Sequence, residues 1–147
     1  MIRKAQKEDI NKLLEIENSV FSEYDFKLTK RCFIYHQKKG HIYVVQDNDI
    51  ICAYFLFLEY KKSLRLYSIA VSKEFTNKGF GSKMIEYLIK LAHEKLKNII
   101  LEVKLDNTNA INLYQKYGFM KKKILRSYYL DGKDGIKMVL LKNLQKI

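Results

Sequence analysis

A ten-residue segment, residues 75–84, carries the clearest chemical signal in this sequence. It holds two glycines, Gly79 and Gly81, with Lys78 and Lys83 beside them. A strand-like stretch precedes the segment, and a stretch with helical periodicity follows it. The first N–H groups of a helix lack intrahelical partners, and the helix dipole is positive there, so this end attracts anions. Because glycine has no Cβ, an anion can approach the backbone, and the segment predicts a pyrophosphate site.

Glu102 interrupts a strand-like run that is otherwise apolar, residues 99–103. The period of two in a strand places Glu102 on the same face as Ile100 and opposite Leu101 and Val103. A carboxylate in such a run is costly unless it is solvated, paired or functional. A wet strand face, or a lysine that pairs with the carboxylate, would be the ordinary explanation, and an acid/base role is the alternative.

Tyr114 lies in a second segment with helical periodicity, which Asn107 precedes and Gly118 ends. Its apolar side carries Tyr114 itself, so ordinary core packing is one reading of this residue. A purely structural role of Asn107 would be to cap the helix N-terminus. A tyrosine hydroxyl can also donate a proton, because its unperturbed pKa is about 10.

Composition limits the possible classes of protein. The chain has 147 residues with 48% hydrophobic and 30% charged side chains, which is typical of one folded domain and not of a disordered chain. The net charge of +12 predicts attraction to an anionic partner, such as a phosphorylated cofactor, RNA or an acidic protein. The N-terminus lacks a signal peptide, and the longest apolar run, residues 50–58, is too short to span a bilayer. We therefore expect a cytoplasmic protein without membrane attachment.

The cysteines and histidines point to no metal or redox chemistry. Cys32 and Cys52 are isolated from each other and lie among apolar residues, which favours buried free thiols over a disulfide or a nucleophile. His36, His41 and His93 lack metal-ligand spacing, and we expect no metal site.

The chain reads as one domain, residues 1–147, without a linker, repeat or low-complexity segment. Its expected order is β-αα-βββ-α-β-α-ββ, a single mixed α/β sheet. The expected strands are residues 2–5, 41–45, 50–60, 64–71, 99–104, 119–129 and 136–141. The expected helices are residues 7–19, 29–37, 80–96 and 108–117.

This order and these motifs resemble the GNAT family of acetyltransferases, and most of all its RimI-type members, which acetylate the N-terminal amine of a ribosomal protein. The resemblance covers nearly the whole chain and is densest over residues 64–129. It implies the GNAT fold, a single mixed, mostly antiparallel sheet flanked by helices. The matching positions are residues 66–71, Gly79-Phe80-Gly81, Leu101-Glu102-Val103, Asn107, Ala110-Ile111, Leu113-Tyr114, Tyr117-Gly118-Phe119 and Arg126-Ser127-Tyr128-Tyr129.

The resemblance implies acetyl-CoA as the cosubstrate. The loop amides would hold its pyrophosphate, and the strand before the loop would pair with the pantetheine arm. The amide near Ile69 would also stabilise the oxyanion of the tetrahedral intermediate. Thr76 stands where the family usually has Gln or Arg. The implied cofactor-binding residues are Ile69, Ala70, Val71, Asn77, Lys78, Gly79, Phe80, Gly81, Ser82 and Asn107.

The resemblance also implies two catalytic residues. Glu102 would act as general base through a water, because a substrate ammonium must lose a proton before its nitrogen can attack the thioester. Tyr114 would return a proton to the departing thiolate. No cysteine lies among these motifs, so we expect direct transfer in a ternary complex and no acetyl-enzyme.

The expected acceptor is the N-terminal α-amine of a protein, a ribosomal protein in the RimI case. The tyrosines Tyr128 and Tyr129 would line the peptide channel, with strand-face aromatics as the ordinary alternative. Tyr24 lies in residues 21–26, where the family places its other peptide-binding wall. This segment lacks the Pro-Trp pair usual in RimI-type sequences, so the acceptor stays open at this stage.

Other functions stay open on the sequence alone. Within the same enzyme class, the acceptor could be a lysine or a small-molecule amine. A coenzyme A-binding module without catalysis is a second class, which the retention of Glu102 and Tyr114 disfavours. An RNA-binding domain is a third class. The run Lys121–Lys123 is interpreted first as a solvated face, with an RNA or ribosome contact as the alternative. The sequence lacks RNA-recognition motifs and zinc-finger spacing, so nucleic acid is not expected as a direct substrate.

Overall fold

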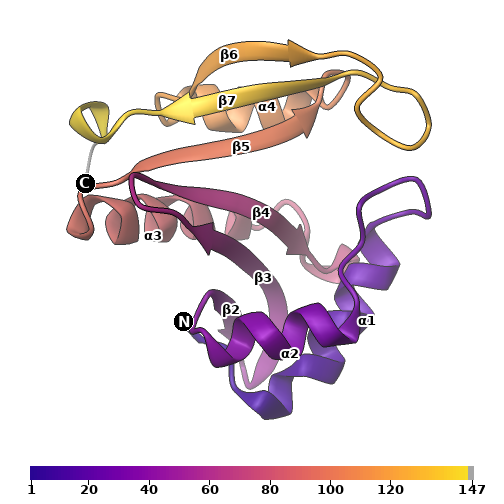
Figure 1. Cartoon of the computed structure of the whole chain (residues 1–147). Helices are drawn as coiled ribbons and strands as arrows, with labels where there is room; N and C mark the ends of the chain where they lie inside the picture. Colours follow the sequence, from indigo (N-terminus) through magenta and orange to yellow (C-terminus); the bar gives the residue numbers. More distant parts are fainter. Residues whose placement is uncertain (146–147) are drawn as a thin grey trace. The chain divides into compact units, whose positions relative to one another are not determined.

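The computed structural model describes residues 1–145. Within them, seven strands form a mixed sheet in the order β1-β2-β3-β4-β5-β7-β6 (Figure 1). The expected order of strands and helices along the chain is confirmed, with short 3-10 turns added at residues 7–9, 73–75 and 142–144. The strands are β1 (Ile2–Lys4), β2 (Ile42–Asp47), β3 (Ile50–Glu59), β4 (Ser63–Val71), β5 (Asn98–Lys104), β6 (Met120–Leu125) and β7 (Gly135–Leu140). The helices are α1 (Ile10–Val20), α2 (Lys30–Lys38), α3 (Phe80–Glu94) and α4 (Thr108–Lys116).

The chain divides into two compact units. The first unit comprises Met1–Phe57 and Ser68–Met84, and the second comprises Leu58–Tyr67 and Ile85–Ile147. Strand β4 and helix α3 each continue from one unit into the other. No helix among residues 1–145 is both long enough and apolar enough to cross a membrane.

The first unit is built on β1, β2 and β3, which pair antiparallel. Thr29 caps α2 by accepting a hydrogen bond from the Cys32 N–H, as its residue type favours. Side chains on the apolar faces of α1 and α2 are buried, as are those of the strands in this unit. Phe33 on α2 contacts Tyr54 on β3 edge to face. The fully buried residues of this core include Leu13, Ile16, Phe33, Val44 and Phe55.

A carboxylate lies inside this apolar core. Glu17 on α1 is 1% exposed and accepts hydrogen bonds from the Tyr54 hydroxyl and from Ser68 Oγ (3.3 Å). The Leu28 N–H donates to its other oxygen at 2.7 Å. Burial raises the pKa of Glu17, and the three donors oppose that rise because each favours the ionised form. The network joins α1, β3, β4 and the segment before α2.

The second unit contains one parallel and two antiparallel strand pairings. Residues Ser63–Leu66 of β4 run parallel to Asn98–Leu101 of β5. Strand β7 pairs antiparallel with both β5 and β6. Alternate residues of these strands are buried: Leu64, Leu66, Ile99, Leu101, Val103, Ile136, Met138 and Leu140. The alternation confirms that Glu102 lies on the face opposite Leu101 and Val103.

Two expected elements end two or more residues earlier than the sequence predicted. Helix α3 ends at Glu94, and Leu96, expected as its last residue, has a φ of 56° and is 70% exposed. Strand β6 ends at Leu125, not at Tyr129. Ser127 adopts a φ of 46°, which a continuing strand cannot have, and its N–H donates to Asp134 Oδ1 at 2.8 Å. The tyrosines that follow therefore lie in a loop, and their interpretation as strand-face aromatics is wrong.

Candidate active site

The glycine loop belongs to the first unit and leads directly into α3. Asn77 and Gly79 both have positive φ, 63° and 81°. A Cβ on Gly79 would meet no atom within 4 Å, so glycine is favoured there by the backbone conformation and not by crowding. Helix α3 begins at Phe80, where the Lys83 N–H donates to the Gly79 carbonyl at 3.1 Å. The predicted loop and the start of the helix are thus confirmed, while the pyrophosphate that they would bind stays a prediction.

The side chains of this loop are arranged around two phenylalanines. Lys78 lies over the Phe75 ring at 5.4 Å and Lys83 over the Phe80 ring at 5.5 Å. The two rings lie 6.3 Å apart. The Thr76 hydroxyl donates to the Lys73 carbonyl at 3.1 Å, so its polar group is used within the loop. The two ammonium groups add positive charge near the free N–H groups, which fits a pyrophosphate.

The residues expected to pair with pantetheine are the last three of β4. Ala70 is 3% exposed, whereas Ile69 and Val71 are half-buried. They follow Ser68, whose hydroxyl is hydrogen-bonded to Glu17 and Tyr54. The buried network therefore fixes the start of the segment to which the cofactor role is assigned.

In the second unit, Glu102 is paired with an arginine. Arg65 Nε donates to Glu102 Oε2 at 3.1 Å, and a second guanidinium nitrogen lies 3.1 Å from Oε1. The Glu102 side chain is 17% exposed and that of Arg65 is 24% exposed. A bidentate pair of this kind fixes the orientation of the carboxylate. The partner of Glu102 is thus Arg65 and not the lysine that the ordinary explanation named.

Tyr114 lies on α4 and is 6% exposed. Its ring packs 5.5 Å from Phe119, and burial raises the pKa of Tyr114 to about 12. No residue in the described part of the chain, 1–145, hydrogen-bonds to its hydroxyl. Asn107 caps α4 by accepting from the Ala110 N–H at 3.2 Å, as the sequence predicted. Tyr114 is therefore protonated near neutral pH.

The three tyrosines assigned to the substrate lie in loops. Tyr24 is 50% exposed and follows Ser22, whose N–H donates to Asp25 at 2.8 Å. Tyr128 and Tyr129 contact each other edge to face at 5.1 Å. A Cβ on Gly135 would lie 3.0 Å from the Tyr129 ring, so glycine permits this close approach.

Sequence reasoning missed Arg65 and the Glu17 network. Arg65 lies on β4 and pairs in register with Ile100, two residues before Glu102 on the same face of β5. An arginine in an otherwise apolar strand was a signal, but its partner depends on the parallel register of two strands far apart in the sequence. Glu17 was hidden within an ordinary amphipathic helix pattern.

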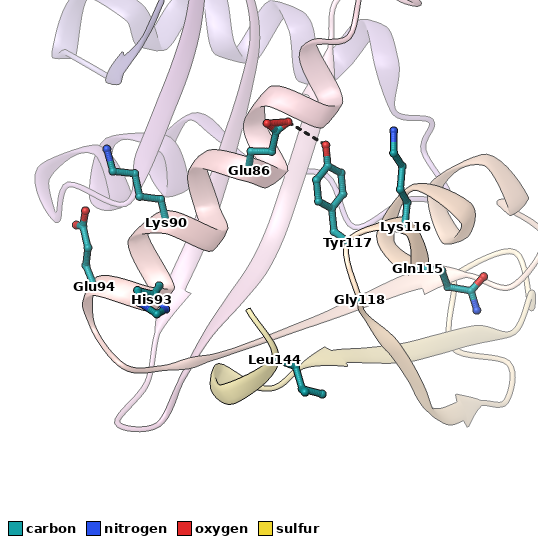
Figure 2. A pocket seen from close by; sticks show the side chains of 9 residues that line it. All are labelled: Glu86, Lys90, His93, Glu94, Gln115, Lys116, Tyr117, Gly118 and Leu144. Atoms are coloured by element: carbon teal, nitrogen blue, oxygen red, sulfur yellow. Dashed lines mark hydrogen bonds between the residues drawn. The ribbon is translucent and has the colours of Figure 1, made fainter. Parts of the chain in front are cut away.

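One cavity of the second unit has a volume of about 980 Å³ (Figure 2). The hydroxyl of Tyr117 donates to Glu86 at 2.9 Å on its wall. Neither Glu102 nor Tyr114 lines it, so it is not the place where the catalytic pair was predicted. Its walls come from α3, the end of α4 and the last 3-10 turn: Glu86, Lys90, His93, Glu94, Gln115, Lys116, Tyr117, Gly118 and Leu144.

No group of three or more His, Cys, Asp or Glu side chains in the described residues could hold a metal ion. The two free cysteines differ in burial, since Cys52 is buried and Cys32 is half-buried.

The chain is similar in sequence and in structure to known N-acetyltransferases. An N-alpha-acetyltransferase from Sulfolobus acidocaldarius is 30% identical over 154 aligned positions, covering 93% of this chain and 89% of that protein. One from Sulfurisphaera tokodaii is 40% identical over 73 residues, 48% of this chain and 44% of that protein. The structure of ribosomal-protein-S18-alanine N-acetyltransferase from Escherichia coli superimposes with a TM-score of 0.85 at 26% identity, covering 95% of this chain and 92% of that one. The model of the acetyltransferase (GNAT) family matches residues 8–119, more than half of the chain, and the protein therefore belongs to this family.

Proposed function

We propose that this GNAT enzyme transfers an acetyl group from acetyl-CoA to the N-terminal α-amine of a protein. The observation that carries the proposal is a carboxylate held by Arg65 on a sheet face, Glu102, in a chain that also has a glycine loop suited to an anion at the start of α3. The N-alpha-acetyltransferases and the ribosomal-protein acetyltransferase to which the chain is similar support an α-amine as acceptor.

The loop and β4 are the parts of the chain that would bind acetyl-CoA. The amides of residues 77–82, with Lys78 and Lys83, would hold the pyrophosphate. The backbone of Ile69, Ala70 and Val71 would pair with the pantetheine amides. Asn107, which caps α4, would also contact the cofactor arm.

Glu102 and Tyr114 would handle the protons. Glu102 accepts a proton from the α-ammonium group, through a water, and the freed amine attacks the thioester carbonyl carbon. The amide near Ile69 donates to the oxyanion that forms. When the C–S bond breaks, the hydroxyl of Tyr114 donates to the departing thiolate, and the second proton that the nitrogen loses on becoming an amide restores that hydroxyl. The acetyl group thus moves directly from sulfur to nitrogen without an acetyl-enzyme.

The proposal has three further parts: the acceptor is a ribosomal protein, the enzyme is cytoplasmic, and residues 1–147 form a single catalytic domain. The family match supports the single domain, because it runs without a break through sequence that belongs to both compact units. Tyr24, Tyr128 and Tyr129, all in loops, would contact the peptide.

The test is thiol release from acetyl-CoA with a panel of acceptors. The panel contains peptides with free Ala, Ser, Met and Gly N-termini, N-blocked peptides that carry lysine, and polyamines. We expect turnover only with the free N-termini. Turnover confined to lysine peptides or polyamines would show a different acceptor for the same chemistry. Coenzyme A binding without any turnover would contradict catalysis of this kind.

A further inference from the structure

Two lysines lie in one row across the strands with Glu102. In the antiparallel register Lys137 on β7 pairs with Glu102 on β5, and on its other side it pairs with Lys123 on β6. Directly paired residues point to the same face of a sheet. The row therefore runs from the carboxylate to two ammonium groups, here called the lysine pair (Lys123 and Lys137).

The lysine pair carries uncompensated charge. Like charges directly opposite each other on neighbouring strands repel. Glu102 could neutralise Lys137 from across the strand, but both of its oxygens are bound by Arg65. Among residues 1–145, neither lysine of the pair has an ion-pair partner. Lys104, on the same face of β5, is by contrast bound to Asp131 at 3.5 Å.

The surroundings of the lysine pair are accessible to a ligand. Lys123 is exposed and Lys137 is half-buried. Met120 on β6 is 49% exposed, and Tyr67 on β4 is 38% exposed. This face of the strands therefore offers two free cations beside some apolar surface and a carboxylate, a combination suited to an extended peptide with an acidic side chain.

We propose that the lysine pair selects acceptors with an aspartate or glutamate close behind the N-terminus. The inference rests on the proposed function, since it takes Glu102 as the place where the α-amine binds. Neighbouring strands are about 4.8 Å apart, so Lys123 lies roughly 10 Å from Glu102. An extended peptide advances about 3.3 Å per residue, which places the selected acidic side chain at the second to fourth position.

The experiment compares three peptides that share an N-terminal alanine. They carry Asp-Glu, Asn-Gln or Lys-Lys at the second and third positions. We expect kcat/KM for the acidic peptide to exceed that for the neutral one about 5- to 20-fold, mainly through KM, as two partly exposed ion pairs allow. The preference should shrink as ionic strength rises, because salt screens exposed charges.

Two double variants separate the lysine pair from general surface charge. Lys123→Gln with Lys137→Gln should reduce the acidic-to-neutral ratio to about one. Lys121→Gln with Lys122→Gln removes the same charge from the same strand, β6, and should keep the wild-type ratio. Lys123→Glu with Lys137→Glu should reverse the preference toward the lysine peptide. Because each readout is a ratio between peptides on one variant, partial loss of folded enzyme does not change it.

Turnover of all three peptides by the wild type without preference would overturn the inference and leave the proposed function intact. A preference that survives in the Lys123→Gln/Lys137→Gln variant would also overturn it. If no free N-terminus is acetylated, the proposed function fails and the inference fails with it.

Discussion

Arg65 on β4 and Glu102 on β5 form a bidentate ion pair with both contacts at 3.1 Å. The two residues are 37 positions apart in the sequence, and the parallel register of the strands brings them to the same face. The guanidinium contacts both oxygens and so fixes the orientation of the carboxylate that we propose as the base.

Arg65→Met should lower kcat/KM for a peptide acceptor about 10- to 100-fold while the Kd for acetyl-CoA changes little, because a displaced catalytic group is costly. The guanidinium holds the Glu102 carboxylate by two contacts at 3.1 Å, and without it the proposed base loses its fixed position. Arg31→Met, which removes an exposed arginine of α2, should match the wild type in both quantities. An unchanged kcat/KM for Arg65→Met would show that the ion pair does not position the proposed base.

Tyr114→Phe should lower kcat about 100-fold or more while the Kd for acetyl-CoA changes little. The substitution keeps the buried ring and removes the hydroxyl that would donate to the thiolate. Because burial raises the pKa of Tyr114 to about 12, its ionisation should cause no loss of wild-type activity up to about pH 10. Single-turnover kinetics and calorimetric titration measure the two quantities. Tyr35→Phe, at an exposed position of α2, is the control. Equal kcat values for the Tyr114→Phe and Tyr35→Phe variants would refute the role of Tyr114 as proton donor.

Glu17→Gln should change how stability depends on pH. Burial raises the pKa of Glu17 above its usual value, so the folded state holds the proton more tightly than the unfolded state. The stability that this carboxyl contributes is therefore fully present below its pKa in the unfolded state, and it is lost as the pH rises through its pKa in the folded state. Glutamine cannot titrate. The unfolding free energy of the variant, relative to that of the wild type, should therefore be higher at pH 7.5 than at pH 5.

Urea unfolding at several pH values measures this effect. Each pH unit between the two pKa values changes the difference in unfolding free energy by up to about 1.4 kcal/mol. Glu15→Gln, at an exposed position of the same helix, should run parallel to the wild type. A Glu17→Gln curve that also runs parallel would mean that the pKa of Glu17 is not raised.

Gly79→Ala should destabilise the fold by about 1–2 kcal/mol and weaken binding of acetyl-CoA. The φ of 81° is unfavourable for a residue with a Cβ, even though the Cβ would have open space. Gly132 is a matched control, because its φ is 82° and its surroundings are equally open. Gly132→Ala should cost the same stability and leave the Kd for acetyl-CoA unchanged. Equal cofactor affinity in both variants would argue against the loop as the pyrophosphate site.

Much of the secondary structure could be predicted because its signals are local. The period of two around Glu102 and the amphipathic pattern of α3 depend on neighbouring residues, and both are confirmed. The errors occurred where one residue adopts a left-handed conformation, at Leu96 after α3 and at Ser127 after β6. Neither residue is a glycine, so the residue type does not predict the end of the helix or the strand.

The sequence by itself determined the order of the elements, the glycine loop before α3, and a carboxylate within an apolar strand. These follow from residue type and spacing along the chain, as does the family resemblance that named Glu102 and Tyr114. Only the tertiary structure decided that Arg65 holds Glu102 and that Lys137 faces Lys123 without a counter-charge. Such partnerships depend on strand register, which is set by packing between distant segments and cannot be read from any one of them.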